Sequence, residues 1–329
     1  MSTNPNPIII AHRGASGYLP EHTLAAKALA HAMGANYLEQ DVVLSRDGTP
    51  IVLHDIHLDS TTDVAQRFPG RARKDGRFYA IDFDLDEIRQ LRVHERTHLD
   101  AAHQGNAVYP QRFPAEHALF SVPTLLEEIT MLAGLDRSRG CQTGVYIELK
   151  SPLWHRCEGL DLPAAIIEVL EQTGYRDRPD QVFLQCFDDQ TLQQLSRELK
   201  AKPLPMIQLI GENGWGEDSA VDYDYLRTPA GLDYVAGYAQ GIGPFIPHIY
   251  HGMTPTGEPQ LSALVEQAQT RGLQVHPYTF RRDELPAGIE SFEQLLDIFI
   301  RQAGVDGLFT DFPDLVVDYL DKLHQSGTN

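Results

Sequence analysis

The first 55 residues of the chain carry two histidines, an arginine and several carboxylates on or just after short apolar runs. Side chains two apart on a strand point to the same face, so Glu39 and Asp41 are predicted to converge on one spot. Imidazoles, a guanidinium and paired carboxylates are the groups that metal-assisted chemistry on a phosphate needs. The residues are His12, Arg13, Glu39, Asp41, His54 and Asp55.

A third carboxylate, Glu148, ends a later apolar run and completes a candidate metal site with Glu39 and Asp41. Three carboxylates without a thiolate suit Ca²⁺ or Mg²⁺ better than zinc. The predicted cofactor is therefore one divalent cation. Arg13 could hold a phosphate oxygen through its fork of donors, and Lys150, two residues beyond Glu148, could add a point charge.

His12 ends a predicted strand, and His54 ends the short apolar run 51–54. Because imidazoles titrate near neutrality, the two form a natural acid and base pair, one helping the attacking oxygen and one protonating the leaving alkoxide. The alternative is that both are metal ligands or donors in a cleft wall. Most other histidines fall in helical or irregular stretches, where solvated or packing roles are expected, although His276 lies at a strand end.

Strand-like apolar runs alternate with segments of helical periodicity along most of the chain, which indicates a parallel sheet covered by helices. Eight such runs predict an α/β fold of the (β/α)8 TIM-barrel type, with the working residues at the carboxyl ends of the strands. The runs are 8–12, 37–43, 144–149, 182–187, 205–210, 239–243, 273–278 and 307–310. The helical segments are 23–33, 124–132, 163–172, 190–199, 261–270 and 291–303.

The chain is longer than the roughly 250 residues of a simple barrel. The charged and irregular stretch 56–122, just after His54 and Asp55, is predicted to be an inserted subdomain beside the cleft, within a single domain that spans 1–329. A second loose stretch, 211–225, is expected to form a rim loop.

Further polar and aromatic side chains come to the same ends of the predicted strands and could line the substrate cleft. Packing in the barrel core remains an alternative for these residues, as helix capping does for Asp311. The candidates for substrate contact, besides Arg13 and Lys150, are Gln185, Phe187, Tyr278 and Phe309.

The composition excludes several classes of partner. With 27 Lys and Arg against 46 Asp and Glu, the formal charge is −19, which predicts no nucleic-acid partner and no stable membrane association. The three cysteines have no spacing typical of a disulfide framework or zinc site. No apolar stretch approaches the ~18 residues of a spanning helix. We expect a cytoplasmic protein if the chain is complete as written, and a periplasmic one if a signal peptide was trimmed.

The residues above closely resemble the glycerophosphodiester phosphodiesterases, particularly the longer bacterial periplasmic members, which use Ca²⁺. The resemblance runs over nearly the full length. It is carried by residues 12–23, 37–41, 52–55, 146–150, 184–187, 275–278 and 307–313.

The resemblance implies a (β/α)8 barrel that hydrolyses glycerophosphodiesters, such as glycerophosphocholine and glycerophosphoethanolamine, to sn-glycerol 3-phosphate and an alcohol. It implies that His12 and His54 are the acid and base and that stretch 56–122 is the family's insertion beside the active-site mouth. The implied metal ligands are Glu39, Asp41 and Glu148, and the implied phosphate contacts are Arg13 and Lys150.

Two other functions stay open at this point. One is a phospholipase D-like enzyme acting on lysophospholipid headgroups, and the other is a noncatalytic barrel that only binds phosphate. The resemblance leaves open direct attack by water or a cyclic phosphate intermediate. The expected assembly is a monomer or homodimer.

Overall fold

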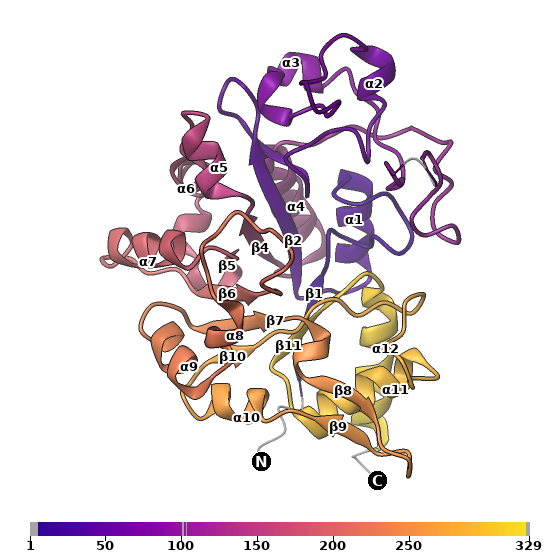
Figure 1. Ribbon diagram of the computed structural model, residues 1–329, viewed down its shortest axis with the longest axis vertical. Coiled ribbons are helices and arrows are strands. Elements are labelled where there is room, and N and C mark those ends of the chain that lie inside the picture. The colour runs from indigo at the N-terminus through magenta and orange to yellow at the C-terminus, as the bar shows by residue number, and fades with distance from the viewer. Residues whose placement is uncertain (1–5, 101, 103, 327–329) are drawn as a thin grey trace.

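The structure is a computed structural model that describes residues 6–100, 102 and 104–326. Eight parallel strands stand side by side in the order β10-β7-β6-β5-β4-β2-β1-β11 (Figure 1). They are β1 (Ile8–Ala11), β2 (Tyr37–Leu44), β4 (Gly144–Leu149), β5 (Val182–Cys186), β6 (Met206–Ile210), β7 (Gly241–Pro244), β10 (Gln274–Val275) and β11 (Gly307–Thr310). The predicted (β/α)8 barrel is confirmed.

The barrel closes where the chain beyond β10 meets β11. The Phe309 N–H donates to the Pro277 carbonyl at 3.1 Å, and Phe280 pairs with Thr310 in parallel. Pro277 has no N–H for a regular ladder, so β10 spans two residues although the sequence predicts a strand over 273–278.

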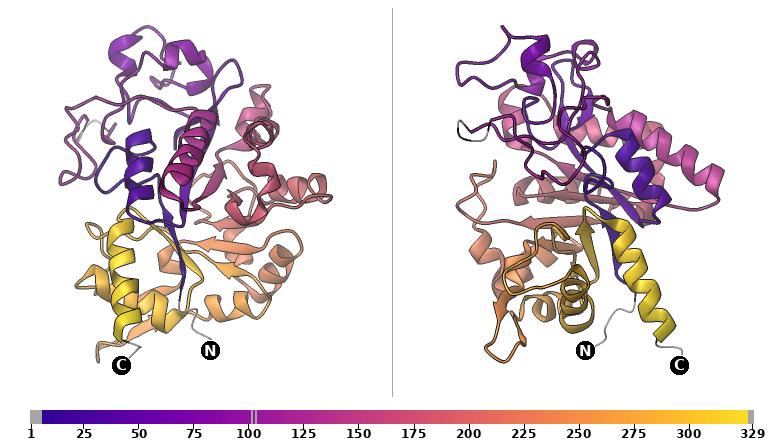
Figure 2. Two further views of the ribbon diagram at one scale, coloured as in Figure 1. Left: turned by 180° about the vertical axis from the view of Figure 1, so that it is seen from behind. Right: turned by 90° about the vertical axis from the view of Figure 1, so that its right-hand side faces the viewer.

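Helices wrap the outside of the barrel. In the view from behind, α1, α4 and α12 cover the strands of the N-terminal half and β11 (Figure 2). The longer helices are α1 (Leu24–Ala32), α4 (Leu125–Arg139), α6 (Leu162–Thr173), α7 (Asp189–Glu198), α9 (Pro229–Ala236) and α12 (Pro313–Ser326). The shorter ones are α5 (Pro152–Cys157), α8 (Tyr223–Leu226), α10 (Leu264–Gln269) and α11 (Phe292–Asp297), which continues as a π-helical turn, Ile298–Ala303.

Local signals account for most helix starts. Thr124 and Glu127 form a reciprocal capping box at α4, and the Asp188 side chain accepts from the Thr191 N–H at α7. Helix α4 runs to Gly140, at φ 68°, well past the predicted end at 132, because its second half is polar and shows little apolar periodicity. Helices α9 and α12 have no counterpart among the predicted helical segments.

The 56–122 segment lies at the top of the molecule in Figure 1, between β3 (Pro50–Val52), which pairs antiparallel with β2, and α4. Among its described residues, the helical elements are α2 (Val64–Arg67), α3 (Leu85–Ile88) and a 3₁₀ turn, Ala80–Asp82. Side chains of this segment, with Val43, Ile51 and Leu53 of the barrel, form a separate apolar cluster around Phe83 and Leu91. Hence the segment packs on the barrel through its own small core.

A two-stranded hairpin, β8 (Tyr250–Met253) and β9 (Pro259–Leu261), lies outside the barrel. Within the described ranges, none of the helices has the length and apolar character to cross a membrane.

Candidate active site

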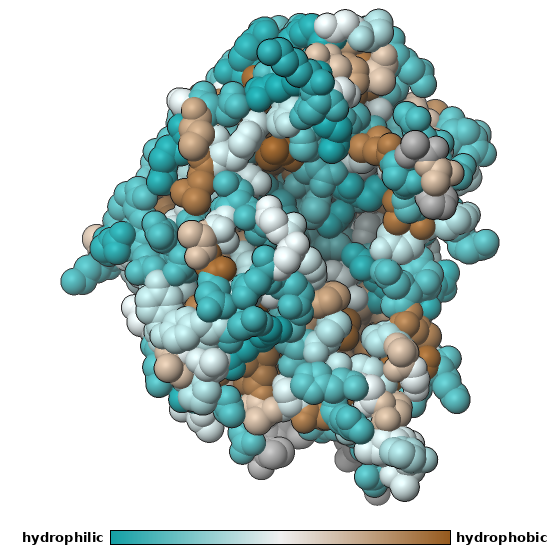
Figure 3. All heavy atoms as spheres, viewed as in Figure 1, coloured by the Kyte–Doolittle hydropathy of each residue, from teal (hydrophilic) through white to brown (hydrophobic). Residues whose placement is uncertain are grey.

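A cavity of about 300 Å³ opens at the carboxyl ends of the strands. In Figure 3, hydrophilic side chains line a hollow in the middle of the face seen in Figure 1. All eleven residues predicted for the site line this cavity, and six further residues join them. The predicted set is His12, Arg13, Glu39, Asp41, His54, Glu148, Lys150, Gln185, Phe187, Tyr278 and Phe309. The others are Leu209, Trp215, Glu217, Phe245, Thr279 and Arg281.

Three carboxylates form a tight cluster in the cavity. Glu39 and Asp41 share one face of β2, and the β2–β4 register sets Asp41 beside Glu148. One oxygen of each lies within 4.8 Å of one oxygen of the other two, and all three side chains are buried. The Oδ1 atom of Asp41 has no hydrogen-bond partner among the described residues. The spacing suits oxygen ligands around one hard cation.

Simultaneous ionisation of all three carboxyl groups is unfavourable in this buried cluster. Burial, followed by the charge of Asp41, raises the pKa of Glu39 well above its ordinary value. Burial raises the pKa of Glu148 to about 8, with Asp41 acting in the same direction against the nearby Lys150. Burial would raise the pKa of Asp41 too, but His54 and His22 hold that pKa well below its ordinary value. A cation is what would allow both glutamates to ionise.

Arg13 is held in place at the end of β1 by its backbone and its side chain. It adopts φ 57°, and its N–H donates to Glu39 Oε2 at 2.6 Å. Its Nη1 donates to both oxygens of Glu21 at 3.1 Å, and its Nε lies 3.5 Å from Asp41 Oδ2. The next residue, Gly14, has φ 90° and lies so close to α1 that a Cβ would stand 2.8 Å from the Ala26 carbonyl carbon. The Arg-Gly pair therefore packs closely against α1 and orients the guanidinium.

Two further polar side chains complete the floor of the cavity. Lys150 Nζ lies 2.8 Å from Glu148 Oε1 and 3.4 Å from His54 Nε2. Gln185, on β5, donates to Glu39 Oε1 at 3.4 Å. Arg13 and Lys150 thus bring two positive charges to a cavity in a strongly acidic protein, which favours an anionic ligand.

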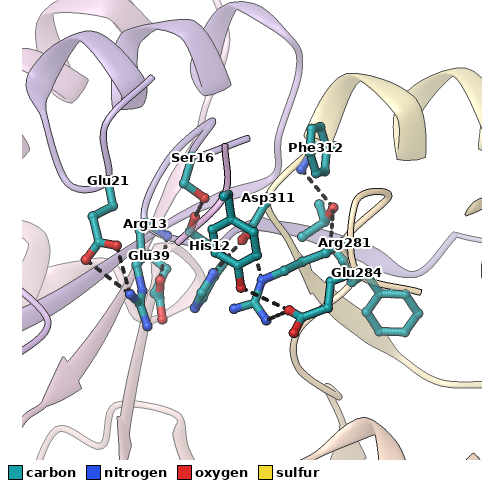
Figure 4. Close-up of polar contacts among 12 residues, drawn as sticks. His12, Arg13, Ser16, Glu21, Glu39, Arg281, Glu284, Asp311 and Phe312 are labelled. Carbon is teal, nitrogen blue, oxygen red and sulfur yellow. Dashed lines mark hydrogen bonds and ion pairs between the residues drawn. The ribbon is translucent and has the colours of Figure 1, made fainter. Parts of the chain in front are cut away.

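Each of the two histidines has a carboxylate on its Nδ1 atom. His12 Nδ1 lies 2.6 Å from Asp311 Oδ1, and His54 Nδ1 lies 2.6 Å from Asp55 Oδ1. In Figure 4, His12 and Asp311 meet from the two ends of the chain, with Arg13 beside them. A carboxylate on Nδ1 fixes the ring and its tautomer and leaves Nε2 for proton transfer.

Both imidazoles are neutral in the free protein at neutral pH. Burial, followed by the charge of Arg13, lowers the pKa of His12 to about 4, against the effect of Asp311. Burial, followed by Arg13 and Lys150, lowers the pKa of His54 to about 3. A bound phosphate anion would oppose these cations and raise both values.

Aromatic rings form the opposite wall. The Tyr278 ring contacts Phe187 and Phe245 at centroid distances of 6.1 and 5.9 Å, and Trp215 contacts Phe245 at 5.1 Å. Trp215 and Glu217 come from the stretch predicted to be a rim loop. Phe309 lines the cavity and also packs on Tyr146 in the barrel interior, so the two roles considered for it coexist.

Sequence reasoning missed several residues that hold the site. His22 Nε2 lies 2.7 Å from Asp41 Oδ2, whereas the sequence indicated a packing or solvated role. Asp311, for which helix capping was an alternative, contacts His12, Arg112 and Arg281 through its side chain. His276 is fully buried in the barrel against Tyr146 and does not reach the cavity. An acidic residue within a few positions of a strand end was the available signal for Asp311.

A parallel barrel whose mouth combines a three-carboxylate cluster, three cationic side chains and two histidine–carboxylate pairs has the features of a phosphoester hydrolase. Comparison with known proteins agrees. The glycerophosphoryl diester phosphodiesterase family pattern matches residues 12–315, and the chain belongs to this family. It is an enzyme of the glycerophosphodiester phosphodiesterase class.

Individual relatives match along most of the chain. A glycerophosphodiester phosphodiesterase of Haemophilus influenzae is 40% identical over 95% of this chain and 89% of its own length. One of Treponema pallidum is 37% identical over 96% of this chain and 92% of its own. The crystal structure of a putative glycerophosphoryl diester phosphodiesterase from Silicibacter pomeroyi superposes with a TM-score of 0.70 at 26% identity, covering 96% of this chain and 94% of that one.

Proposed function

We propose that the enzyme hydrolyses glycerophosphodiesters, including glycerophosphocholine and glycerophosphoethanolamine, to sn-glycerol 3-phosphate and the free alcohol. The observation that carries the proposal is the placement of two histidine–carboxylate pairs beside one buried three-carboxylate cluster in one cavity. A site that only bound phosphate would need neither a second imidazole nor the carboxylates that orient both.

The donor set fits one divalent cation. Glu39, Asp41 and Glu148 would hold it, since their oxygens lie within 4.8 Å of one another and Asp41 Oδ1 is unpartnered among the described residues. Ca²⁺ is the proposed ion and Mg²⁺ the second choice, because all three ligands are hard oxygens. When bound, the ion supplies charge stabilisation at the phosphoryl group.

The protein's own groups would divide the remaining tasks. Arg13 binds a phosphate oxygen through its guanidinium, and Lys150 adds a positive charge on the other side of the cavity. One histidine accepts the proton of the attacking hydroxyl at Nε2, and the other, which takes up a proton when the bound phosphate raises its pKa, donates that proton from Nε2 to the leaving alkoxide oxygen. The phosphorus–oxygen bond to the alcohol breaks as the new one forms, and water supplies the oxygen of the product either directly or after a cyclic phosphate.

The polar floor and the aromatic wall of the cavity indicate which side chains would contact the substrate. Gln185 has an amide within reach of the cluster, and the aromatic wall, with Phe187, Tyr278 and Phe309, offers apolar faces to the carbon skeleton. The single domain over 1–329 with 56–122 as its insertion, the compartment and the monomeric or dimeric state remain predictions.

A coupled assay for glycerol 3-phosphate release tests the proposal, with release of choline or ethanolamine measured in parallel because a lysophospholipid yields lysophosphatidate and the free alcohol. Glycerophosphocholine, glycerophosphoethanolamine and lysophosphatidylcholine are compared after chelation, with and without added Ca²⁺, Mg²⁺ or Zn²⁺. We expect turnover of the two water-soluble diesters only, and only with a divalent ion. Turnover restricted to the lipid would point to the phospholipase D-like function, and no turnover under any condition would contradict the proposal.

A further inference from the structure

Two arginines of the 56–122 segment contact the carboxylates that pair with His54 and His12. Arg96 Nη1 lies 2.7 Å from Asp55 Oδ2, while the other oxygen of Asp55 contacts His54. Arg112 Nη2 lies 2.7 Å from Asp311 Oδ2, while Oδ1 of Asp311 contacts His12. Each histidine therefore begins the same chain of imidazole, carboxylate and guanidinium, and both guanidinia come from one segment outside the barrel.

Both arginines are fixed by further partners, which gives them one orientation. Arg96 clamps Glu21 through Nε and Nη2, at 2.9 and 2.6 Å, and its side chain is 18% exposed. Arg112 clamps Asp283 at 2.8 and 3.0 Å, lies 3.7 Å from the Tyr109 ring centroid, and is 4% exposed. A second cavity of about 220 Å³ lies between the segment and the barrel, and both arginines and both histidines line it.

The positive charges near Asp55 and Asp311 affect the ionisation of these two carboxylates. Asp311 is buried and the Asp55 side chain is 22% exposed, and desolvation alone would raise the pKa of each. Arg96, followed by His54, holds the pKa of Asp55 well below its ordinary range, and Arg281, followed by His12 and then Arg112, does the same for Asp311, so both carboxylates stay ionised. An ionised carboxylate accepts from the imidazole Nδ1–H and keeps it there, whereas a protonated one could reverse the bond and put the wrong tautomer in place.

The two positions differ in how much support they have. Asp311 has a second guanidinium, from Arg281, at 2.8 Å, whereas Asp55 contacts Arg96 alone among the described cations and otherwise accepts from Ser60. Loss of Arg96 should therefore disturb the orientation of His54 more than loss of Arg112 disturbs that of His12.

From these contacts we propose that Arg96 and Arg112 are positioning residues, through which the 56–122 segment sets the orientation and tautomer of His54 and His12. The inference rests on the proposed roles of the two histidines. It makes the segment a functional part of the active site as well as a wall beside it.

The test compares Arg96→Met, Arg112→Met and the conservative Arg96→Lys in the glycerol 3-phosphate release assay. Arg77→Met is the matched control, because Arg77 clamps Asp59 at 2.7 and 2.8 Å within the same segment and neither residue lines either cavity. We expect kcat to fall at least ~10-fold in Arg96→Met and less in Arg112→Met, with Arg96→Lys in between and Arg77→Met near wild type. Near-wild-type kcat in folded Arg96→Met would overturn the inference.

A second measurement separates positioning from general support of the fold. Arg96→Met is repeated in the Asp55→Asn background, and Arg112→Met in the Asp311→Asn background. If an arginine acts through the carboxylate, replacing it should lower kcat less than ~3-fold once that carboxylate is neutral. In the wild-type background, by comparison, Arg96→Met is expected to lower kcat ~10-fold. An equal loss in both backgrounds would show a structural role and overturn the inference.

Two features keep the outcomes separable. Thermal unfolding of every variant identifies those folded at the assay temperature, and Arg96→Lys retains the positive charge if Arg96→Met does not fold. His12→Ala and His54→Ala are assayed in parallel: if both retain wild-type rates, the proposed acid–base roles fail and this inference fails with them, whereas if both lose activity and the arginine variants do not, only this inference fails.

Discussion

The Nδ1 atom of His12 lies 2.6 Å from Oδ1 of Asp311, a residue 299 positions further along the chain. This contact joins the end of β1 to the residue after β11, the two strands that neighbour each other where the barrel brings the chain ends together. It orients the His12 ring, and under the proposed mechanism it would leave Nε2 for proton transfer and make activity depend on closure of the barrel.

Replacing Asp311 with Asn should therefore disable His12 without unfolding the protein. Asparagine can donate to the imidazole and favour the wrong tautomer, so we expect kcat to fall by roughly 10²-fold or more. Steady-state kinetics checks this, with circular dichroism as the test of folding. A kcat within ~3-fold of wild type would mean that the Asp311 contact does not matter for catalysis.

The two histidines should each be essential. His12→Ala and His54→Ala are each expected to reduce kcat by ~10²-fold or more, because each removes one proton-transfer step. The matched control is His57→Ala, which changes a half-buried histidine of the 56–122 segment that does not line the catalytic cavity. Wild-type rates in both site variants would remove the acid–base pair from the mechanism.

Chelation should abolish activity and also change stability. Without a cation the Glu39 and Glu148 carboxyls sit beside Asp41 at raised pKa values, so an added divalent ion that binds the folded state should raise the melting temperature. We expect this shift with Ca²⁺ and its loss in Glu148→Gln. The melting temperature gives a readout independent of turnover, and full activity in excess chelator would contradict the metal site.

Buried His276 should make the stability depend on pH. Burial lowers the pKa of His276 from 6.5 to about 3, so between these values the unfolded chain binds a proton that the folded chain does not. The free energy of unfolding should therefore rise with pH across this window, by about 1.4 kcal/mol per pH unit for this group, and its contribution is lost as pH falls below 6.5.

His276→Gln should remove that part of the slope while keeping an acceptor for the Tyr146 hydroxyl, which lies 2.9 Å from Nδ1. Urea unfolding at several pH values between 4 and 7 measures the difference. An unchanged slope would mean that His276 titrates normally in the folded protein.

A buried ion pair under β2 should be costly to break. Lys27 Nζ lies 2.7 Å from Glu128 Oε1, and both side chains have no exposed surface. Lys27→Met leaves Glu128 without its cation, and we expect a loss of about 3–5 kcal/mol in the free energy of unfolding. Arg89→Met, which breaks the exposed pair with Glu127, should cost less than about 1 kcal/mol.

The sequence by itself determined the barrel and the centre of its site. Continuous apolar strands separated by helices define a parallel sheet, and strand alternation puts Glu39 and Asp41 on one face. Since parallel strands end at one face of a barrel, the strand pattern alone also assigns His12 and Glu148 to that face. His54 follows β3, which pairs antiparallel with β2, so this rule does not place it there although it lines the same cavity.

Only the tertiary structure decided what surrounds those residues. Arg96 and Arg112 lie in an irregular segment with no periodicity, so nothing local indicates where their side chains go. Asp311 reaches His12 because the barrel closes, and His22 reaches Asp41 because its backbone turns at φ 60°. Contacts between charged groups far apart in sequence depend on how loops pack, and short-range patterns do not encode that packing.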